Sequence, residues 1–149
     1  MKLSTKGRYG LRAMVDLALN AEEGHLALSA IADRQNISMQ YLEQVFSILR
    51  KAELVRSVKG ANGGYSLMSP ASKITVGSIL KALEGNLSIV GNRTEIEDGN
   101  QNPIEECIRE SLWDKIDENI NAFIESITLA DLAENSRKYR VDSEIMFHI

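Results

Sequence analysis

A change in hydrophobic period after residue 52 constrains the fold of this chain more than any other feature. Before it, apolar residues recur at intervals of three and four, as they do on one face of an α-helix. After it, the segments 54–59 and 65–68 alternate with a period close to two, which is typical of β-strands. The glycine-rich segment 60–64 lies between them and supplies the positive φ angles of a tight turn. The pattern predicts helices followed by a β-hairpin with a flexible tip.

Three helices are predicted ahead of the hairpin, the first over residues 3–20. A short helix at 29–35 is expected to end at Asn36, because asparagine tolerates the left-handed conformation. Ser38 is suited to cap the third helix. The inward face of that helix is expected to contain Leu42, Val45, Leu49 and Ala52.

Helix signals return after the hairpin. Thr75 is suited to cap a helix that stops at Gly85, and the polar segment 86–102 is predicted to be a mobile loop. Pro103 suits the first turn of a long helix reaching about Ile127. Thr128 and Asp131 resemble a capping box for a short helix through Leu129 and Leu132, and the early part of the tail that follows is expected to be disordered.

Length and composition exclude several classes of protein. With 149 residues, 44% of them hydrophobic, the chain fits one compact domain or a small domain with an extension. Its single cysteine, Cys107, excludes an intrachain disulfide and does not by itself supply a four-ligand metal site. No apolar run approaches the roughly 18 residues of a membrane span, and the N-terminus is polar where a signal peptide is apolar. We therefore expect a cytoplasmic protein.

Charge is distributed unevenly along the chain. Residues 1–69 contain 9 basic and 6 acidic side chains, an excess of +3, whereas the remainder contains 8 basic and 15 acidic side chains, an excess of −7. A basic front half is suited to a polyanion, although an excess of this size is also compatible with an ordinary solvated surface.

Helix, short helix, turn, second helix and hairpin, in that order, predict a winged helix-turn-helix, whose second helix enters the DNA major groove. Glutamine pairs with adenine and glutamate accepts from the cytosine amino group, while cations neutralise phosphates. Each of these side chains is also an ordinary surface residue when taken singly. The predicted base-reading positions are Ser38, Gln40, Glu43 and Gln44, and the predicted phosphate contacts are Lys2, Lys6, Arg8, Arg56 and Lys59.

Three separated motifs strongly resemble the bacterial Rrf2 family of transcription regulators: 4–10 (STKGRYG), 41–44 (YLEQ) and 58–65 (VKGANGGY). The resemblance covers residues 1 to about 132. It adds Tyr41, Asn62 and Gly63 to the predicted DNA-binding residues, and it implies a homodimer whose long helices pack together. The spacing of 3, 4, 3 and 4 residues predicts the same seam, whose alternative is packing within one subunit. The predicted dimerisation residues are Trp113, Ile116, Ile120, Phe123 and Ile127.

The predicted fold is therefore mainly α with a small β-hairpin wing, a winged helix-turn-helix unit joined to a long dimerisation helix. Its predicted parts are the DNA-binding unit at 1–85, with the helix-turn-helix at about 28–51 and the wing at about 54–68, the loop 86–102, the dimerisation helix and short helix at 103–135, and the C-terminal tail 136–149.

Two branches of the family differ in their cysteines. The IscR-type branch, which regulates iron–sulfur cluster or redox-stress genes, has three cysteines near the start of the long helix, whereas this chain has only Cys107, followed by Glu110. Because an iron–sulfur cluster takes about four ligands, mostly thiolates, we expect no such cofactor. Cys107 is the only candidate metal ligand, and its alternatives are a half-buried core residue or a thiol that forms a disulfide between subunits.

The C-terminus resembles the CymR-type branch, which represses cysteine metabolism genes. That resemblance implies a complex with O-acetylserine sulfhydrylase, docked through Met146, Phe147, His148 and Ile149. A terminal carboxylate suits a nest of backbone N–H groups. The alternatives are a frayed tail without a partner and a tail folded back on its own dimer.

Functions of other classes have less support. The sequence has no Gly-x-Gly-x-x-Gly motif and no Gly-Lys-Ser/Thr phosphate loop, so no enzyme activity is predicted. An interaction module that does not bind DNA remains an alternative. The patterns predict DNA binding, and the resemblance implies a homodimeric repressor of cysteine and sulfur genes, with IscR-type regulation as the alternative.

Overall fold

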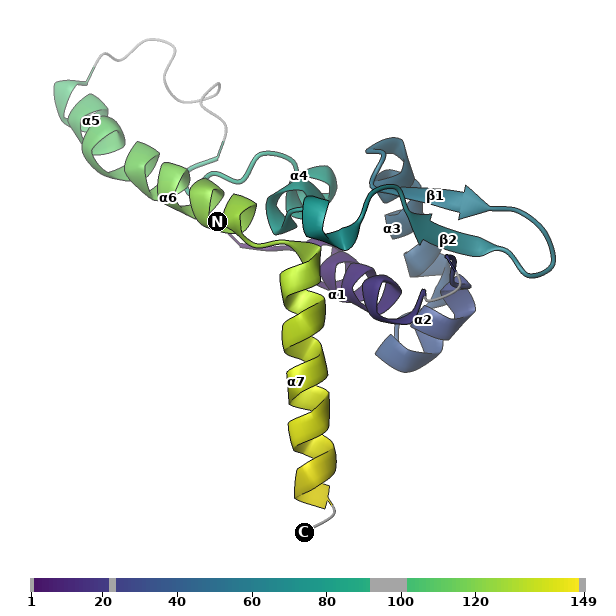
Figure 1. Cartoon of the computed structure of the whole chain (residues 1–149). Helices are drawn as coiled ribbons and strands as arrows, with labels where there is room; N and C mark the ends of the chain where they lie inside the picture. The colour runs from purple at the N-terminus through teal and green to yellow at the C-terminus, as the bar shows by residue number, and fades with distance from the viewer. Residues whose placement is uncertain (1, 22–23, 92–101, 148–149) are drawn as a thin grey trace.

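The helix-turn-helix predicted from the sequence is present in the computed structural model, which describes residues 2–21, 24–91 and 102–147 (Figure 1). Asn36 ends the second helix at φ 54° and ψ 50°, the left-handed conformation expected of it. The Ser38 hydroxyl accepts a hydrogen bond from the Tyr41 amide at 3.2 Å and so caps the third helix. These helices are α1 (Thr5–Asn20), α2 (Leu28–Gln35) and α3 (Met39–Lys51).

The predicted hairpin is also confirmed. β1 (Val55–Val58) and β2 (Gly64–Leu67) pair antiparallel, with Val55 opposite Leu67 and Val58 opposite Gly64. The core beneath the hairpin is formed mainly by α1 and α3, and its largest fully buried side chains include Phe46, Met14 and Leu17. Ala52, which was predicted to face inward, is exposed because it lies at the C-cap of α3, where the helix ends.

Close packing of α1 on α4 (Val76–Glu84) depends on two glycines. A Cβ at Gly7 would overlap the Glu84 carboxylate, and a Cβ at Gly10 would overlap the buried Leu83 side chain. The space at Gly7 lets the Glu84 carboxylate accept hydrogen bonds from the backbone amides of Ser4 and Gly7, at 2.9 and 3.0 Å. The carboxylate thereby satisfies two amides at the N-terminus of α1, where a negative charge is stabilising.

A second core cluster joins α4 to the C-terminal helices. Val76, Leu80 and Ile124 are buried together, and Ile127 packs against them. The Glu125 carboxylate accepts hydrogen bonds from Lys81 Nζ at 3.1 Å and Thr75 Oγ1 at 3.0 Å, and the bond from Lys81 lowers the pKa of Glu125. Thr75 also caps α4 as predicted, and Gly85 ends it at φ 79°.

The segment 86–102 differs in part from the predicted mobile loop. Asp117 holds its first residues, because its carboxylate accepts hydrogen bonds from Ser88 Oγ at 2.9 Å and the Ile89 amide at 2.8 Å. Leu87 is buried in the second core cluster. Residues 92–101 of the predicted loop lie outside the described residues.

The predicted long helix projects from the body as an arm on the side opposite the hairpin (Figure 1). Pro103 begins the arm, and Asn102 caps it by accepting a hydrogen bond from the Ile104 amide at 3.0 Å. The helix is not uniform, since a π-helical segment interrupts it. The arm is α5 (Pro103–Ile108), the π-helical segment Arg109–Trp113, and α6 (Asp114–Ser126).

The C-terminal tail was predicted wrongly. The capping box is confirmed by hydrogen bonds of 3.0 and 3.1 Å that Thr128 and Asp131 exchange, but the helix it starts, α7 (Leu129–Phe147), continues through most of the predicted tail. Strong helix formers such as Ala, Glu, Lys and Arg fill its first half, and Arg137 pairs with Glu134 at 3.1 Å. Among the described helices, none is both long enough and apolar enough to cross a membrane.

We predict that Gly10→Ala lowers the free energy of unfolding in urea. Alanine favours a helix by about 1 kcal/mol over glycine, but the new methyl group overlaps buried Leu83, and overpacking a core costs about 1–3 kcal/mol. Leu83→Ala should cost about 2–5 kcal/mol by itself. The double variant should lose less than the sum of the two, because the shortened side chain makes room for the new methyl group. Strictly additive losses would contradict the predicted contact.

Candidate nucleic-acid interface

The predicted base-reading residues share the solvent face at the start of α3. Leu42, Val45, Phe46 and Leu49 are buried on the opposite face of this helix and fix its rotation. As a consequence Gln40, Glu43 and Gln44 are exposed, next to the capping residue Ser38. An exposed polar face at the N-terminus of a helix held by the core is the arrangement that helix-turn-helix proteins use to reach base edges.

Tyr41 lies differently from its neighbours. It is half-buried, and its ring packs edge-on against Tyr9 of α1, with ring centroids 6.1 Å apart. Arg12 lies over the other ring of this pair, 5.0 Å from the Tyr9 centroid. Tyr41 therefore contributes to the packing of α3 against α1.

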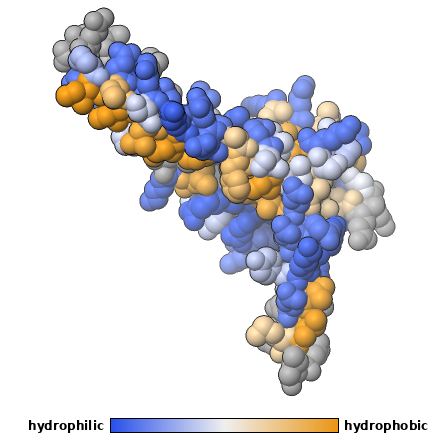
Figure 2. Space-filling model, turned by 60° about the vertical axis from the view of Figure 1, so that its left-hand side comes forward, coloured by the Kyte–Doolittle hydropathy of each residue, from blue (hydrophilic) through white to orange (hydrophobic). Residues whose placement is uncertain are grey.

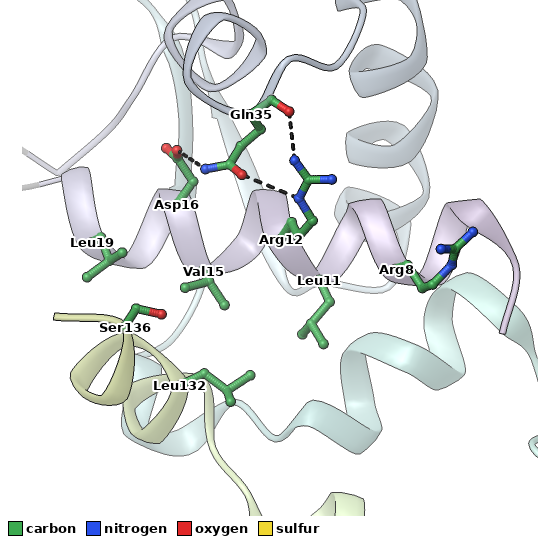
Figure 3. Close-up of a pocket in the computed structure, with 9 residues that line it drawn as sticks. All are labelled: Arg8, Leu11, Arg12, Val15, Asp16, Leu19, Gln35, Leu132 and Ser136. Atoms are coloured by element: carbon green, nitrogen blue, oxygen red, sulfur yellow. Dashed lines mark hydrogen bonds between the residues drawn. The ribbon is translucent and has the colours of Figure 1, made fainter. Parts of the chain in front are cut away.

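A buried carboxylate fastens α2, the first helix of the helix-turn-helix, to α1. Asp16 is only 2% exposed, and it accepts hydrogen bonds from Arg34 at 2.7 and 3.0 Å and from Gln35 Nε2 at 2.9 Å. The hydrogen bond that Arg34 donates to Asp16 raises the pKa of Arg34. Arg12 adds a bond from its Nη2 to the Gln35 carbonyl at 2.7 Å (Figure 3).

Sequence reasoning did not single out this network, although it contained a signal. Asp16 stands among the inward positions Ala13, Met14 and Leu17 of α1, and a carboxylate on an apolar face requires partners when it is buried. The identity of those partners depends on how α2 folds back, which the sequence pattern does not define.

The basic residues predicted to contact phosphates lie in three places. Lys2, Lys6 and Arg8 are exposed at the start of α1, and Lys59 is exposed beside the turn of the hairpin together with Asn62. Gly63 is half-buried, and it lies so close to the backbone of Val58 that a Cβ there would overlap the Val58 carbonyl. Arg56 is hydrogen bonded through Nε to the buried Ser66 hydroxyl at 2.9 Å, and it lines a hollow beside the end of α1. Arg56 therefore lies apart from Lys59, the basic residue beside the turn of the hairpin.

The arm displays the predicted seam. Trp113, Ile116 and Ile120 are half-buried, and Phe123 is 64% exposed, so the residues described here leave this face largely uncovered. Figure 2 shows apolar residues along one side of the arm. Ile127 packs instead in the second core cluster of its own chain. The seam also extends further toward the N-terminus of the arm than predicted, through the exposed residues Ile104, Ile108 and Leu112.

The surroundings of Cys107 do not fit an iron–sulfur cluster. Its thiol is exposed and lies 3.8 Å from the Ser111 hydroxyl, and Glu110 lies nearby in the same shallow hollow. Among the described residues, no three histidine, cysteine or acidic side chains gather into a metal-binding group. Since such clusters take about four ligands, mostly thiolates, a chain with one cysteine does not supply the usual set.

Comparison with known proteins places this geometry in a family. The family model Rrf2, described as an iron-dependent transcriptional regulator, matches residues 3–135. The IscR regulator of Serratia proteamaculans is 44% identical over 135 residues, which cover 91% of this chain and 80% of the relative. CymR of B. subtilis, described as its global cysteine regulator, is 43% identical, with a TM-score of 0.75 over 91% of this chain and 98% of that structure. The structure of T. potens IscR is 41% identical, with a TM-score of 0.71 over 91% of this chain and 88% of that one.

Proposed function

Because this chain belongs to the Rrf2 family of DNA-binding transcriptional regulators, we propose that it is a dimeric repressor that reads its operator with α3 and grips the DNA backbone with the wing. Its relatives are helix-turn-helix regulators and not enzymes, and this chain is likewise a regulator. The observation that carries the proposal is the exposed polar face of α3, where Gln40, Glu43 and Gln44 stand together on a helix held by the core. Such a regulator works in the cytoplasm, where its operators are.

In this proposal, base recognition and phosphate binding belong to two different parts of the winged unit. Glu43 and Gln44 offer carboxylate and amide groups that match the cytosine amino group and the adenine edge. Lys59, at the turn of the hairpin, offers only a positive charge, which attracts any phosphate backbone. Sequence preference therefore belongs to α3, and affinity for DNA in general belongs to the wing and the start of α1.

Two substitutions test this division by fluorescence anisotropy with operator DNA selected from random sequences. Glu43→Ala should cost about 1–3 kcal/mol of binding free energy on the preferred operator and relax the base choice at one position.

Lys59→Ala should weaken binding equally on all sequences and lower the slope of log affinity against log salt by about one unit.

The matched control is Glu118→Ala, which removes an exposed carboxylate from the arm and should leave base choice unchanged. An equal loss on all sequences for Glu43→Ala, or a loss confined to one sequence for Lys59→Ala, would contradict the assigned roles.

The homodimer is proposed from the exposed apolar side of the arm. Ile104 is 71% exposed and Phe123 64% exposed, and both lie on an element that projects from the body of its own chain. Exposed apolar stripes of this kind typically mark protein interaction sites. A second copy of the arm offers the same stripe, so a twofold interface covers both at once.

We predict that Phe123→Glu converts the dimer to a monomer in sedimentation analysis at micromolar concentration. The substitution should leave the fold of each subunit intact, because the Phe123 side chain is mostly outside its own core. Met68→Glu, which changes an exposed apolar residue at the end of the hairpin, is the matched control and should remain dimeric. A dimer that survives Phe123→Glu would exclude this face as the interface.

We further propose that the regulated genes concern cysteine and sulfur metabolism and that O-acetylserine sulfhydrylase is the signalling partner. Support comes from the likeness to CymR, the global cysteine regulator of B. subtilis. It also comes from the end of α7, where Ile145 is 54% and Met146 78% exposed. Met146 and Phe147 lie at the end of this helix, while His148 and Ile149 lie outside the described residues. The similarity to two IscR regulators supports IscR-type target genes as the alternative.

We predict that the sulfhydrylase increases the affinity of this protein for promoters of cysteine-uptake genes, measured by anisotropy with and without the enzyme. Deleting Ile149 should abolish the gain and leave binding of the regulator alone unchanged, because α7 ends away from α3 (Figure 1). If the enzyme changes nothing while operator binding persists, the cysteine assignment is wrong and the IscR-type alternative gains support.

A further inference from the structure

A histidine outside the predicted DNA-binding set contacts the tip of the wing. His25, in the connection between α1 and α2, places its Nε2 at 2.6 Å from the carbonyl oxygen of Asn62. Since a carbonyl oxygen only accepts hydrogen bonds, Nε2 carries the proton and the imidazole is the donor. The contact joins residues that are 37 positions apart in sequence.

The neighbouring residue makes the same connection through the backbone. Leu26 and Tyr65 exchange two hydrogen bonds, of 2.8 and 2.9 Å, and form an antiparallel bridge beside β2. Gly64 permits this approach, because a Cβ there would overlap the carbonyl of Leu26. Leu26 therefore lies beside β2 as a single-residue bridge, and His25, its neighbour in sequence, reaches to the turn.

The tip has few other restraints. Each strand of the hairpin has only four residues, and an isolated two-stranded hairpin is marginally stable at best. At the end of β2 next to the turn, the Tyr65 ring packs on Phe46 of α3, with centroids 5.0 Å apart, and this contact fixes the paired strands relative to α3. Within the turn itself, the described residues show one backbone bond that closes the loop, from the Gly63 amide to the Gly60 carbonyl at 3.0 Å. The His25 bond thus extends the restraint from the paired strands into the turn.

We propose that His25 is a positioning residue for DNA binding, which holds the wing tip so that Lys59 and Asn62 meet the DNA backbone while α3 lies in the major groove. The inference rests on the proposed function. Holding the tip in advance of binding reduces the conformational entropy lost when Lys59 engages a phosphate. His25 acts through the wing and makes no contact with DNA in this assignment.

The test compares His25→Ala with His25→Gln in the full-length protein by anisotropy on operator DNA and on random DNA. His25→Ala should weaken binding about three- to tenfold, the effect of one ordinary hydrogen bond, by the same factor on both DNAs. His25→Gln keeps an N–H donor of similar reach and should retain most of the affinity. A loss in His25→Gln as large as in His25→Ala would contradict the role of the hydrogen bond.

A double-variant cycle separates positioning from a general structural effect. Adding His25→Ala to Lys59→Ala should cost less than adding it to the unaltered protein, because the charged contact that His25 prepares is already lost and only that of Asn62 remains. Adding it to Gln44→Ala should cost the full factor, because Gln44 lies on α3. Equal costs in the two backgrounds would overturn the proposal.

A structural measurement makes the outcome independent of affinity. In the free protein, His25→Ala should speed hydrogen exchange of the Gly63 amide while the amides of α3 keep their protection. Unchanged exchange at Gly63 would overturn the proposal even where DNA affinity falls. If the unaltered protein shows no preference for any DNA sequence, the proposed function itself fails, whereas normal operator binding by His25→Ala removes only the positioning role.

Discussion

The close approach of α1 to α4 is the contact on which the rest of the structure depends. It exists because Gly7 and Gly10 have no Cβ, which lets the Glu84 carboxylate reach the first amides of α1 and lets Leu83 pack against the helix. From this position α1 contacts α2, α3, β2 and α7. The glycines of the first sequence motif thus serve the packing of α1 on α4, while the cations of the same motif, Lys6 and Arg8, remain exposed.

The polar network around Asp16 contributes more to the orientation of α2 on α1 than to the stability of the fold. Removing two charges from water costs much of what their attraction returns, so a buried ion pair is weak evidence of a stabilising effect. Arg34 and Gln35 satisfy the buried carboxylate only when α2 has one orientation on α1. Arg12 then connects the same turn to Tyr9 and, through its ring, to Tyr41 at the start of α3. The angle between the two helices of the helix-turn-helix follows from these directional contacts.

Features with local causes were predicted from the sequence, and features with distant causes were not. The caps at Ser38 and Thr75, the left-handed Asn36 and the hairpin all depend on residues within a few positions, and the structure confirms them. The length of α7 was missed because a polar segment was taken as disordered although its residues favour a helix. His25 finds its partner Asn62 37 positions away, and the spacing of residues along the chain does not reveal such a pairing.

The uneven charge along the chain corresponds to two different parts of the fold. The basic excess of residues 1–69 belongs to the winged unit, whereas the acidic excess belongs to the rest of the chain, including the exposed Glu105, Glu106 and Glu110 of the arm. A phosphate backbone attracts the first part and repels the second, which favours the proposed approach to DNA with the wing and α3 foremost. A net charge of −4 at pH 7 also limits indiscriminate binding to nucleic acid. In the proposed complex, stable attachment therefore requires the base contacts of α3 in addition to the few cations of the wing and the start of α1.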